Sequence, residues 1–157
     1  MKKIIKPALW TVLALYTAFA LWLLFIRDRS SSGLGIIEHF KRHNNLIPLS
    51  TVIHDIKQIA EGNNTALYIR NFFGNTMLIF PFGVFLPYLT ERYRSAKRIL
   101  VLFVCIIITV ELSQLLLRVG SVDTDDLIMN VIGGMAGYGV YRSMHRLISS
   151  KTLDNNE

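Results

Sequence analysis

The sequence is poor in the residues on which disulfide scaffolds and soluble enzymes depend. Its single cysteine, Cys105, excludes a disulfide framework within the chain. Charged residues make up 18% of the 157 residues, below the roughly 25% of a typical soluble domain. The four histidines are scattered, so no histidine metal site is indicated, and no serine hydrolase motif can be read. The length fits one domain and excludes a large multidomain enzyme.

Long apolar blocks are what the sequence has instead. Hydrophobic side chains make up 52% of the chain, and about 20 apolar residues suffice to cross a bilayer as a helix. Blocks of this kind cover residues 7–26, 72–90, 98–117 and 125–142. The first exceeds the roughly 7–15 residues of a signal-peptide core, so we expect it to be a retained helix. The pattern predicts an all-α membrane protein with four transmembrane helices.

The basic residues predict the orientation of these helices. The net charge of +6 is spread between the apolar blocks, which is not the pattern of a nucleic-acid-binding surface. If the N-terminus is cytoplasmic, the inner segments carry ten basic residues and the outer segments seven, and seven acidic residues balance the outer ones. Lys and Arg gather on the cytoplasmic side of membrane proteins. We therefore expect residues 1–6 and 143–157 to be cytoplasmic tails of a transmembrane domain over 7–142.

The long outer loop between the first two blocks is expected to have structure of its own. Residues 27–35 are polar and rich in Ser and Gly, which favours a flexible segment. Residues 44–48 are expected to be extended, because the residue before Pro48 avoids the helical region. Ser50 then caps a short helix with apolar residues at helical spacing. That helix either lies in the membrane interface or caps the bundle, and the sequence favours the two equally.

Glu111 is the most informative residue, because it lies inside the third apolar block. A charged carboxylate near the bilayer centre costs about 2.5–3.5 kcal/mol on insertion scales, so such a residue is a functional candidate. Three of the blocks carry polar residues at a similar outer depth and at helical spacing. The sequence therefore predicts one ligand-binding pocket formed by Asn75, Glu111, Gln114, Arg118, Asp126 and Asn130.

Structural roles are the alternative for several of these residues. Glu111 and Arg118 would then form a buried ion pair, and the amides would join helices through hydrogen bonds. For the acidic run, which consists of Asp123, Asp125 and Asp126, we favour a helix start with Asp123 or Thr124 as cap. Asp123 and Asp126 are weak candidates for a hard cation, and no metal or cofactor is predicted. The glycines that follow are predicted to serve helix packing: Gly133, Gly134 and Gly137.

Several short motifs, taken in their order and spacing, resemble the VanZ-like family of small bacterial membrane proteins. They are Asn45-Leu46-Ile47-Pro48, Gly74-Asn75 with Pro81-Phe82-Gly83, Glu111-Leu112-Ser113-Gln114, and the stretch from Gly120 through Asp123 to Asn130 followed by Gly133-Gly134. The resemblance covers roughly residues 16–142. It implies a compact multi-pass helical domain in the bacterial cytoplasmic membrane. The family's namesake is associated with resistance to teicoplanin, a lipid-tailed glycopeptide antibiotic.

The leading functional hypothesis is a protein of the cell envelope that binds or modulates an outer-leaflet ligand. Membrane lipids, a lipid-linked cell-wall precursor or a lipoglycopeptide antibiotic are the expected partners, and glycopeptide resistance is a possible outcome. One rival is an intramembrane enzyme with Glu111 as general base and Asp126 as its partner. The sequence offers no clear nucleophile, which disfavours it. The other rival is a small transporter component with Glu111 as proton relay.

Overall fold

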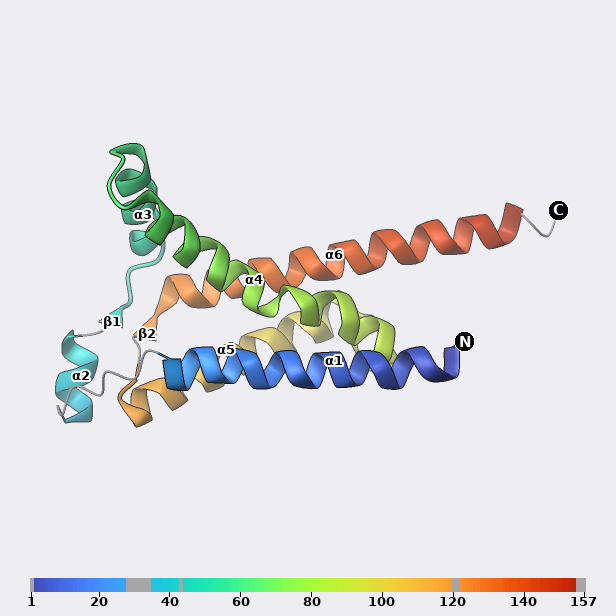
Figure 1. Cartoon of the computed structure of the whole chain (residues 1–157), viewed down its shortest axis with the longest axis horizontal. Coiled ribbons are helices and arrows are strands. Elements are labelled where there is room, and N and C mark those ends of the chain that lie inside the picture. The colour runs from blue at the N-terminus through green and yellow to red at the C-terminus, as the bar shows by residue number, and fades with distance from the viewer. Residues whose placement is uncertain (1, 28–34, 43, 120–121, 155–157) are drawn as a thin grey trace.

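The computed structural model describes residues 2–27, 35–42, 44–119 and 122–154. The predicted flexible segment over 27–35 lies mostly outside them. The elements in chain order are α1 (Lys2–Trp22), the π-helical segment η1 (Leu23–Arg27), α2 (Ile36–Arg42), β1 (Asn44–Asn45), α3 (Ser50–Ala60), α4 (Thr65–Leu89), the 3-10 turn η2 (Glu91–Tyr93), α5 (Ala96–Leu117), β2 (Val122–Asp123) and α6 (Thr124–Asp154). Figure 1 shows α2, α3 and the two strands at one end of the bundle, with the start of α1 and the end of α6 at the other.

Three of the described helices are long and apolar enough to cross a membrane. These candidate spans are Ile5–Ile26, Thr65–Leu89 and Ala96–Leu117. The fourth predicted span lies on α6, whose first half carries Asp125, Asp126 and Asn130 among its apolar residues and is therefore less apolar. The mostly helical architecture is confirmed, with one short strand pairing added to it, while the fourth span and the orientation of the termini stay predictions.

The helices extend beyond the apolar blocks of the sequence. α1 begins at Lys2, α4 begins at Thr65, and α6 continues to Asp154 through the segment expected to be a tail. Hydropathy marks only the part of a helix that is apolar, whereas the backbone hydrogen-bond ladder continues into polar flanks that favour the helix. The seven-residue helix α2 was not predicted, because it is too short to show a clear period.

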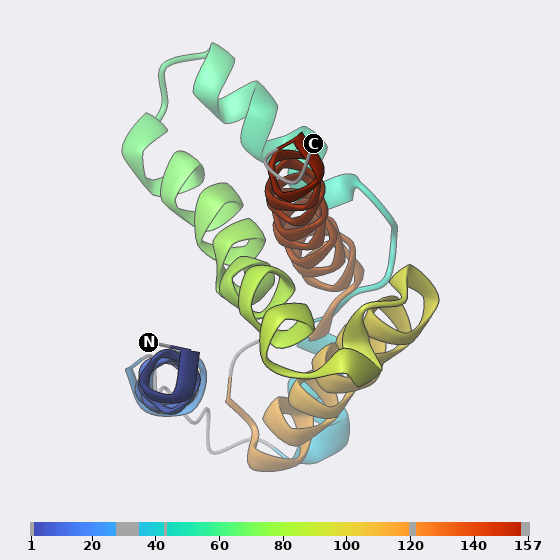
Figure 2. The same ribbon diagram turned by 90° about the vertical axis from the view of Figure 1, so that its right-hand side faces the viewer.

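Glycine residues bring α4 and α6 into direct backbone contact, and this pair forms the most extensive contact between elements. A Cβ atom on Gly133 would overlap the carbonyl oxygen of Thr76, and one on Gly137 would overlap that of Phe80. Gly83 on α4 faces the backbone of Gly134 in the same way. Figure 2 shows α4 and α6 crossing, while α1 stands to one side of them. The two glycine-bearing helices therefore form the rigid centre of the bundle.

The apolar core fills the half of the bundle away from α2 and α3. It consists of side chains from all four long helices: Leu13, Ile79, Leu86, Leu89, Ile99, Phe103, Ile107, Tyr138 and Tyr141. Ile99 and Phe103 are fully inaccessible, so water is excluded at this level. The Tyr138 hydroxyl donates to the carbonyl oxygen of Arg94 at 2.6 Å. Among the described residues, the buried carboxyl and amide side chains lie toward the opposite end, where α2 and α3 are: Asp55, Gln114, Asp125 and Asn130.

Hydrogen bonds to the acidic run join the outer loop to the end of the bundle where α2 and α3 lie. β1 pairs in parallel with β2, and the Asp125 carboxylate accepts hydrogen bonds from the backbone N–H groups of Leu49, Thr51 and Val52. These are the donors that the first turn of α3 leaves unpaired. The prediction that Ser50 caps α3 is wrong, because α3 begins at Ser50 and Leu49 precedes it with φ of 66°. A carboxylate from α6 takes the place of a local cap.

Candidate functional site

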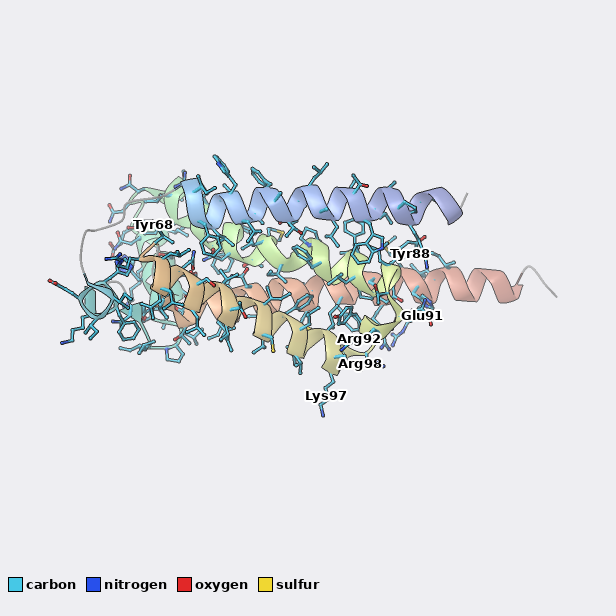
Figure 3. The ribbon with its side chains drawn as sticks, turned by 90° about the horizontal axis from the view of Figure 1, so that it is seen from below. Tyr68, Tyr88, Glu91, Arg92, Lys97 and Arg98 are labelled. Atoms are coloured by element: carbon cyan, nitrogen blue, oxygen red, sulfur yellow. The ribbon has the colours of Figure 1, made fainter. Side chains whose placement is uncertain are left out.

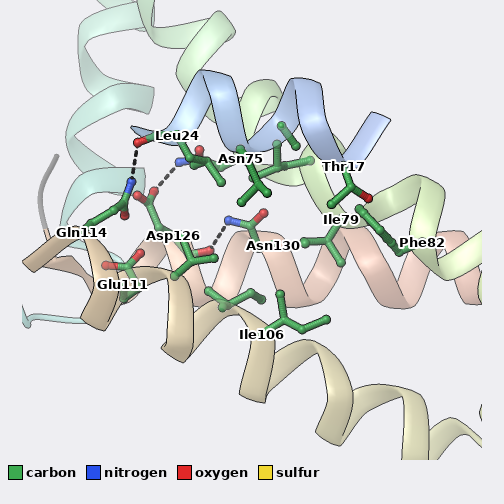
Figure 4. Close-up of a pocket in the computed structure, with 15 residues that line it drawn as sticks. Thr17, Leu24, Asn75, Ile79, Phe82, Ile106, Glu111, Gln114, Asp126 and Asn130 are labelled. Carbon is green, nitrogen blue, oxygen red and sulfur yellow. Dashed lines mark hydrogen bonds between the residues drawn. The ribbon is translucent and has the colours of Figure 1, made fainter. Parts of the chain in front are cut away.

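A cavity of about 210 Å³ lies between α1, α4, α5 and α6, in the half of the bundle nearest the outer loop. Five polar side chains predicted to form a pocket line it: Asn75, Glu111, Gln114, Asp126 and Asn130. Figure 4 shows them gathered from three helices around one space. Drug-sized pockets hold about 300–1,000 Å³, so this cavity suits a small head group rather than a whole large ligand.

Two asparagines bond Asp126, one at its carboxyl group and the other at its backbone carbonyl oxygen. Asn75 Nδ2 donates to Asp126 Oδ1 across the α4–α6 contact. Asn130 Nδ2 donates to the backbone carbonyl oxygen of Asp126 at 2.8 Å, one turn earlier on α6. Asn130 Oδ1 is buried and, among the residues that the structure describes, has no hydrogen-bond partner. Leaving a buried acceptor unpaired costs about 1–3 kcal/mol, so this atom marks a place where a donor is missing.

Glu111 and Gln114 close the side of the cavity that α5 forms. Glu111 Oε2 accepts a hydrogen bond from the backbone N–H of Asp123 at 3.3 Å. Gln114 Nε2 donates to the carbonyl oxygen of Leu24 at 3.1 Å, which links α5 to the π-helical end of α1. Because the spacing of three residues places both side chains on one face of α5, the sequence pattern located them correctly relative to each other.

The lining is rich in acceptors and carries no cation. Neither Lys, Arg nor His is among the described residues that line the cavity, whereas the carboxyl groups of Glu111 and Asp126 both face it. Arg118, which was expected to join the pocket, does not line it. α5 ends one residue before Arg118, whose left-handed backbone with φ of 57° turns away at the helix C-terminus. Its side chain is exposed, so a fully buried Glu111–Arg118 pair is not formed either.

Most of the chain matches a known protein family. A family model, VanZ/LLP1, matches residues 13–147. The chain belongs to this family. A curated relative, Protein VanZ of Enterococcus faecium, is 26% identical over 143 residues, which cover 91% of this chain and 79% of the relative. No solved structure matches the chain. The family match includes all five polar residues of the cavity.

α1 supplies the apolar wall of the cavity in this family member. Thr17, Ala20, Leu21 and Leu24 face the cavity from α1 and η1. Near them, the Tyr16 hydroxyl lies 3.0 Å from the carbonyl oxygen of Leu78 on α4. The contribution of α1 was not foreseen, because an apolar helix gives no sign in the sequence of which side faces a cavity. A π-helical segment often marks a functional site, and here it ends the helix beside the cavity.

Asp123 connects the cavity to the outer loop. Its backbone N–H bonds Glu111, while its carboxylate accepts from the Thr51 hydroxyl at 2.7 Å and from Asn45 Nδ2 at 3.2 Å. Asp123 Oδ1 also accepts from the backbone N–H of Asp125 at 2.8 Å, which is the N-cap of α6 that the sequence predicts. In the described residues, no three His, Cys, Asp or Glu side chains are arranged to hold a metal ion.

Asp55 carries a buried carboxyl group on the side of α3 that faces the acidic run, and 6% of the residue's surface is exposed. Burial raises its pKa above the ordinary carboxyl value. The neighbouring carboxylates of Asp123 and Asp125 raise it further, and the imidazole of His54 opposes the shift. The same acidic run that holds the outer loop therefore disfavours charge on Asp55.

Proposed function

We propose that this protein crosses the bacterial cytoplasmic membrane four times, with α6 as the fourth crossing and both termini in the cytoplasm. The excess of basic residues on the inner segments supports this orientation. The start of α1 and the end of α6 lie at the same end of the bundle in Figure 1, as an even number of crossings requires. The carboxyl groups of α6 then face the cavity or the outer loop and not lipid.

We infer that the cavity binds the polar head of an amphiphile that reaches it from the outer leaflet. The observation that carries this proposal is the buried Asn130 Oδ1, which has no partner among the described residues and lies in a cavity lined by acceptors. A ligand hydroxyl, amide or amine would supply the missing donor. The walls formed by Leu21, Leu24 and Leu78 suit the first part of an acyl chain.

Three ligand classes combine such a head with an apolar chain: an outer-leaflet lipid, a lipid-linked wall precursor and a lipoglycopeptide antibiotic. Teicoplanin belongs to the third class, so binding or modulation at this cavity offers a route to teicoplanin resistance. The absence of a cation among the described lining residues argues against a phosphate as the group recognised inside the cavity.

An intramembrane enzyme is supported by one observation, the two carboxyl groups of Glu111 and Asp126 on a shared cavity. Covalent chemistry would also need a nucleophile. Of the described residues that line the cavity, Thr17 carries the one hydroxyl, and it donates to the carbonyl oxygen of Leu13 at 2.7 Å. Binding therefore has more support than covalent chemistry.

Photo-crosslinking in living cells tests the binding proposal. A benzophenone amino acid at Leu78, which lines the cavity, should capture an amphiphile with a donor-rich head, identified by mass spectrometry of the adduct. The matched control places the same residue at Leu112, which lies outside the cavity lining and is 55% exposed on α5. Bulk lipid should dominate there. Asn130→Leu should abolish the enrichment at Leu78 without lowering protein abundance. Identical adducts at both positions would contradict the proposal.

A further inference from the structure

A second cavity lies outside the bundle, at the end opposite the outer loop. It holds about 360 Å³ and is bordered by Arg92 on η2 and by Lys97 and Arg98 at the start of α5. Figure 3 shows these three basic residues near the turn between α4 and α5. It shares no lining residue with the cavity between the four long helices.

The positive charge of this groove is not neutralised within the described part of the chain. Neither Arg92, Lys97 nor Arg98 has a carboxylate partner among the described residues, and the nearby Glu91 pairs with Arg94 at 2.9 Å. The Arg92 guanidinium lies 6.0 Å from the centroid of the Tyr93 ring, which also borders the groove. These three side chains therefore give one end of the groove a positive charge.

The floor of the groove is apolar and runs along one face of α5. Val101 and Cys105 follow Lys97 at intervals of four residues, and Leu102 follows Arg98 in the same way. At about 1.5 Å per residue, the floor extends about 12 Å from Lys97 to Cys105. Val101 and Cys105 are exposed, so this apolar strip is open to the surroundings of the bundle.

We propose that this groove binds one anionic phospholipid. Its phosphate lies between Arg92, Lys97 and Arg98, and one acyl chain lies along the strip that ends at Cys105. Basic pockets at the ends of transmembrane helices recognise anionic head groups, and guanidinium groups match phosphate oxygens in pairs. The charge at one end and the apolar floor beyond it fit both parts of such a lipid. This site is independent of the ligand proposed for the other cavity.

Lipid binding to the purified full-length protein in a neutral detergent tests this site, with bound lipid counted by native mass spectrometry. Phosphatidylglycerol should bind more tightly than phosphatidylcholine with the same chains. Each cation near an anionic head contributes about fivefold, so Lys97→Gln/Arg98→Gln should weaken phosphatidylglycerol binding about 25-fold. The control Lys6→Gln/Arg146→Gln changes the same charge at exposed positions outside the groove and should leave binding unchanged.

Alkylation of Cys105, the only cysteine in the sequence, gives a second readout on the unaltered protein. Phosphatidylglycerol should slow its reaction with a maleimide, whereas soluble glycerol phosphate should not, because it lacks the chain that covers the thiol. Protection should disappear in Lys97→Gln/Arg98→Gln. Equal binding of phosphatidylcholine, equal weakening in the control variant, or binding without protection of Cys105 would each overturn the proposal.

Discussion

Removing the carboxylate of Asp125 is expected to release the outer loop while leaving the membrane helices folded. The side chain is 1% exposed and accepts three backbone N–H groups at the start of α3. From the sequence alone, Asp125 is expected to make a weak interaction with the dipole of its own helix. Asp125→Asn would then have only a small effect on stability. The structure revises that expectation upward, because the three donors lie at the start of α3 and not on the helix that carries Asp125.

The size of the effect follows from the bonds lost. Removing an N-cap costs about 0.5–2 kcal/mol, and hydrogen bonds to a charged group contribute about 1.5–3 kcal/mol. For Asp125→Ala we therefore expect a loss of about 2–3 kcal/mol in the docking of α3, or a factor of about 30–150. Asp125→Asn keeps one oxygen acceptor and loses the charge, so about 1–1.5 kcal/mol, or about tenfold, is expected.

Amide hydrogen exchange of α3 measures this directly, because exchange there reports local opening rather than global unfolding. The α3 amides should exchange faster by the stated factors, while those of α5 keep their protection. Glu61→Gln is the matched control, since it removes an exposed carboxylate from the other end of α3 and should change exchange about twofold at most. If the α3 amides exchange at the same rate in Asp125→Ala as in Glu61→Gln, the reasoning is refuted.

Three further predictions follow from the same structure. Glu111→Gln should reduce the enrichment of the amphiphile adduct at Leu78 without lowering membrane abundance; a collapse in abundance would point to a structural role of Glu111 instead. Gly137→Ala should lower thermal stability by about 1–3 kcal/mol, because the added methyl overlaps the backbone of Phe80, whereas Gly139→Ala, with nothing within 4 Å, should be neutral or stabilising. The raised pKa of Asp55 means that the folded loop holds this proton more tightly than the unfolded loop does. The contribution of Asp55 to the stability of the folded loop is therefore greatest below the ordinary carboxyl pKa. It is lost as the pH rises through the raised pKa of Asp55. α3 exchange in Asp55→Asn should be slower than in the wild type at pH 7, with the difference shrinking toward pH 4.

The sequence predicted the cavity residues because their positions obey helical geometry. Glu111 and Gln114 share a face of α5, and Asp126 and Asn130 share one of α6, so two helices that pack with these faces together bring them to one cavity. Hydropathy likewise identified the three long apolar helices. The sequence did not indicate that Asn130 Oδ1 has no hydrogen-bond partner among the described residues, since that depends on the distances between helices.

The sequence did not predict the contacts that join distant parts of the chain. The α3 donors lie 73 to 76 residues before Asp125, and no local pattern connects an acidic residue to a helix start so far away. Arg118 was placed in the pocket by extending the face of α5 one turn further, but the helix ends at Leu117. A helix end depends on the backbone conformation of one residue, which spacing alone does not fix.

The attachment of α1 leaves much of its sequence free to change. The Tyr16 hydroxyl bonds the carbonyl oxygens of Met77 and Leu78, and the Gln114 amide bonds that of Leu24. All three acceptors belong to the main chain, which every amino acid supplies. Substitutions at the accepting positions therefore keep the bonds, whereas the two donating side chains and Leu13 in the apolar core are required. The face of α1 that lines the cavity can therefore change its apolar side chains, and so adapt to a ligand, while these hydrogen bonds keep the helix in the bundle.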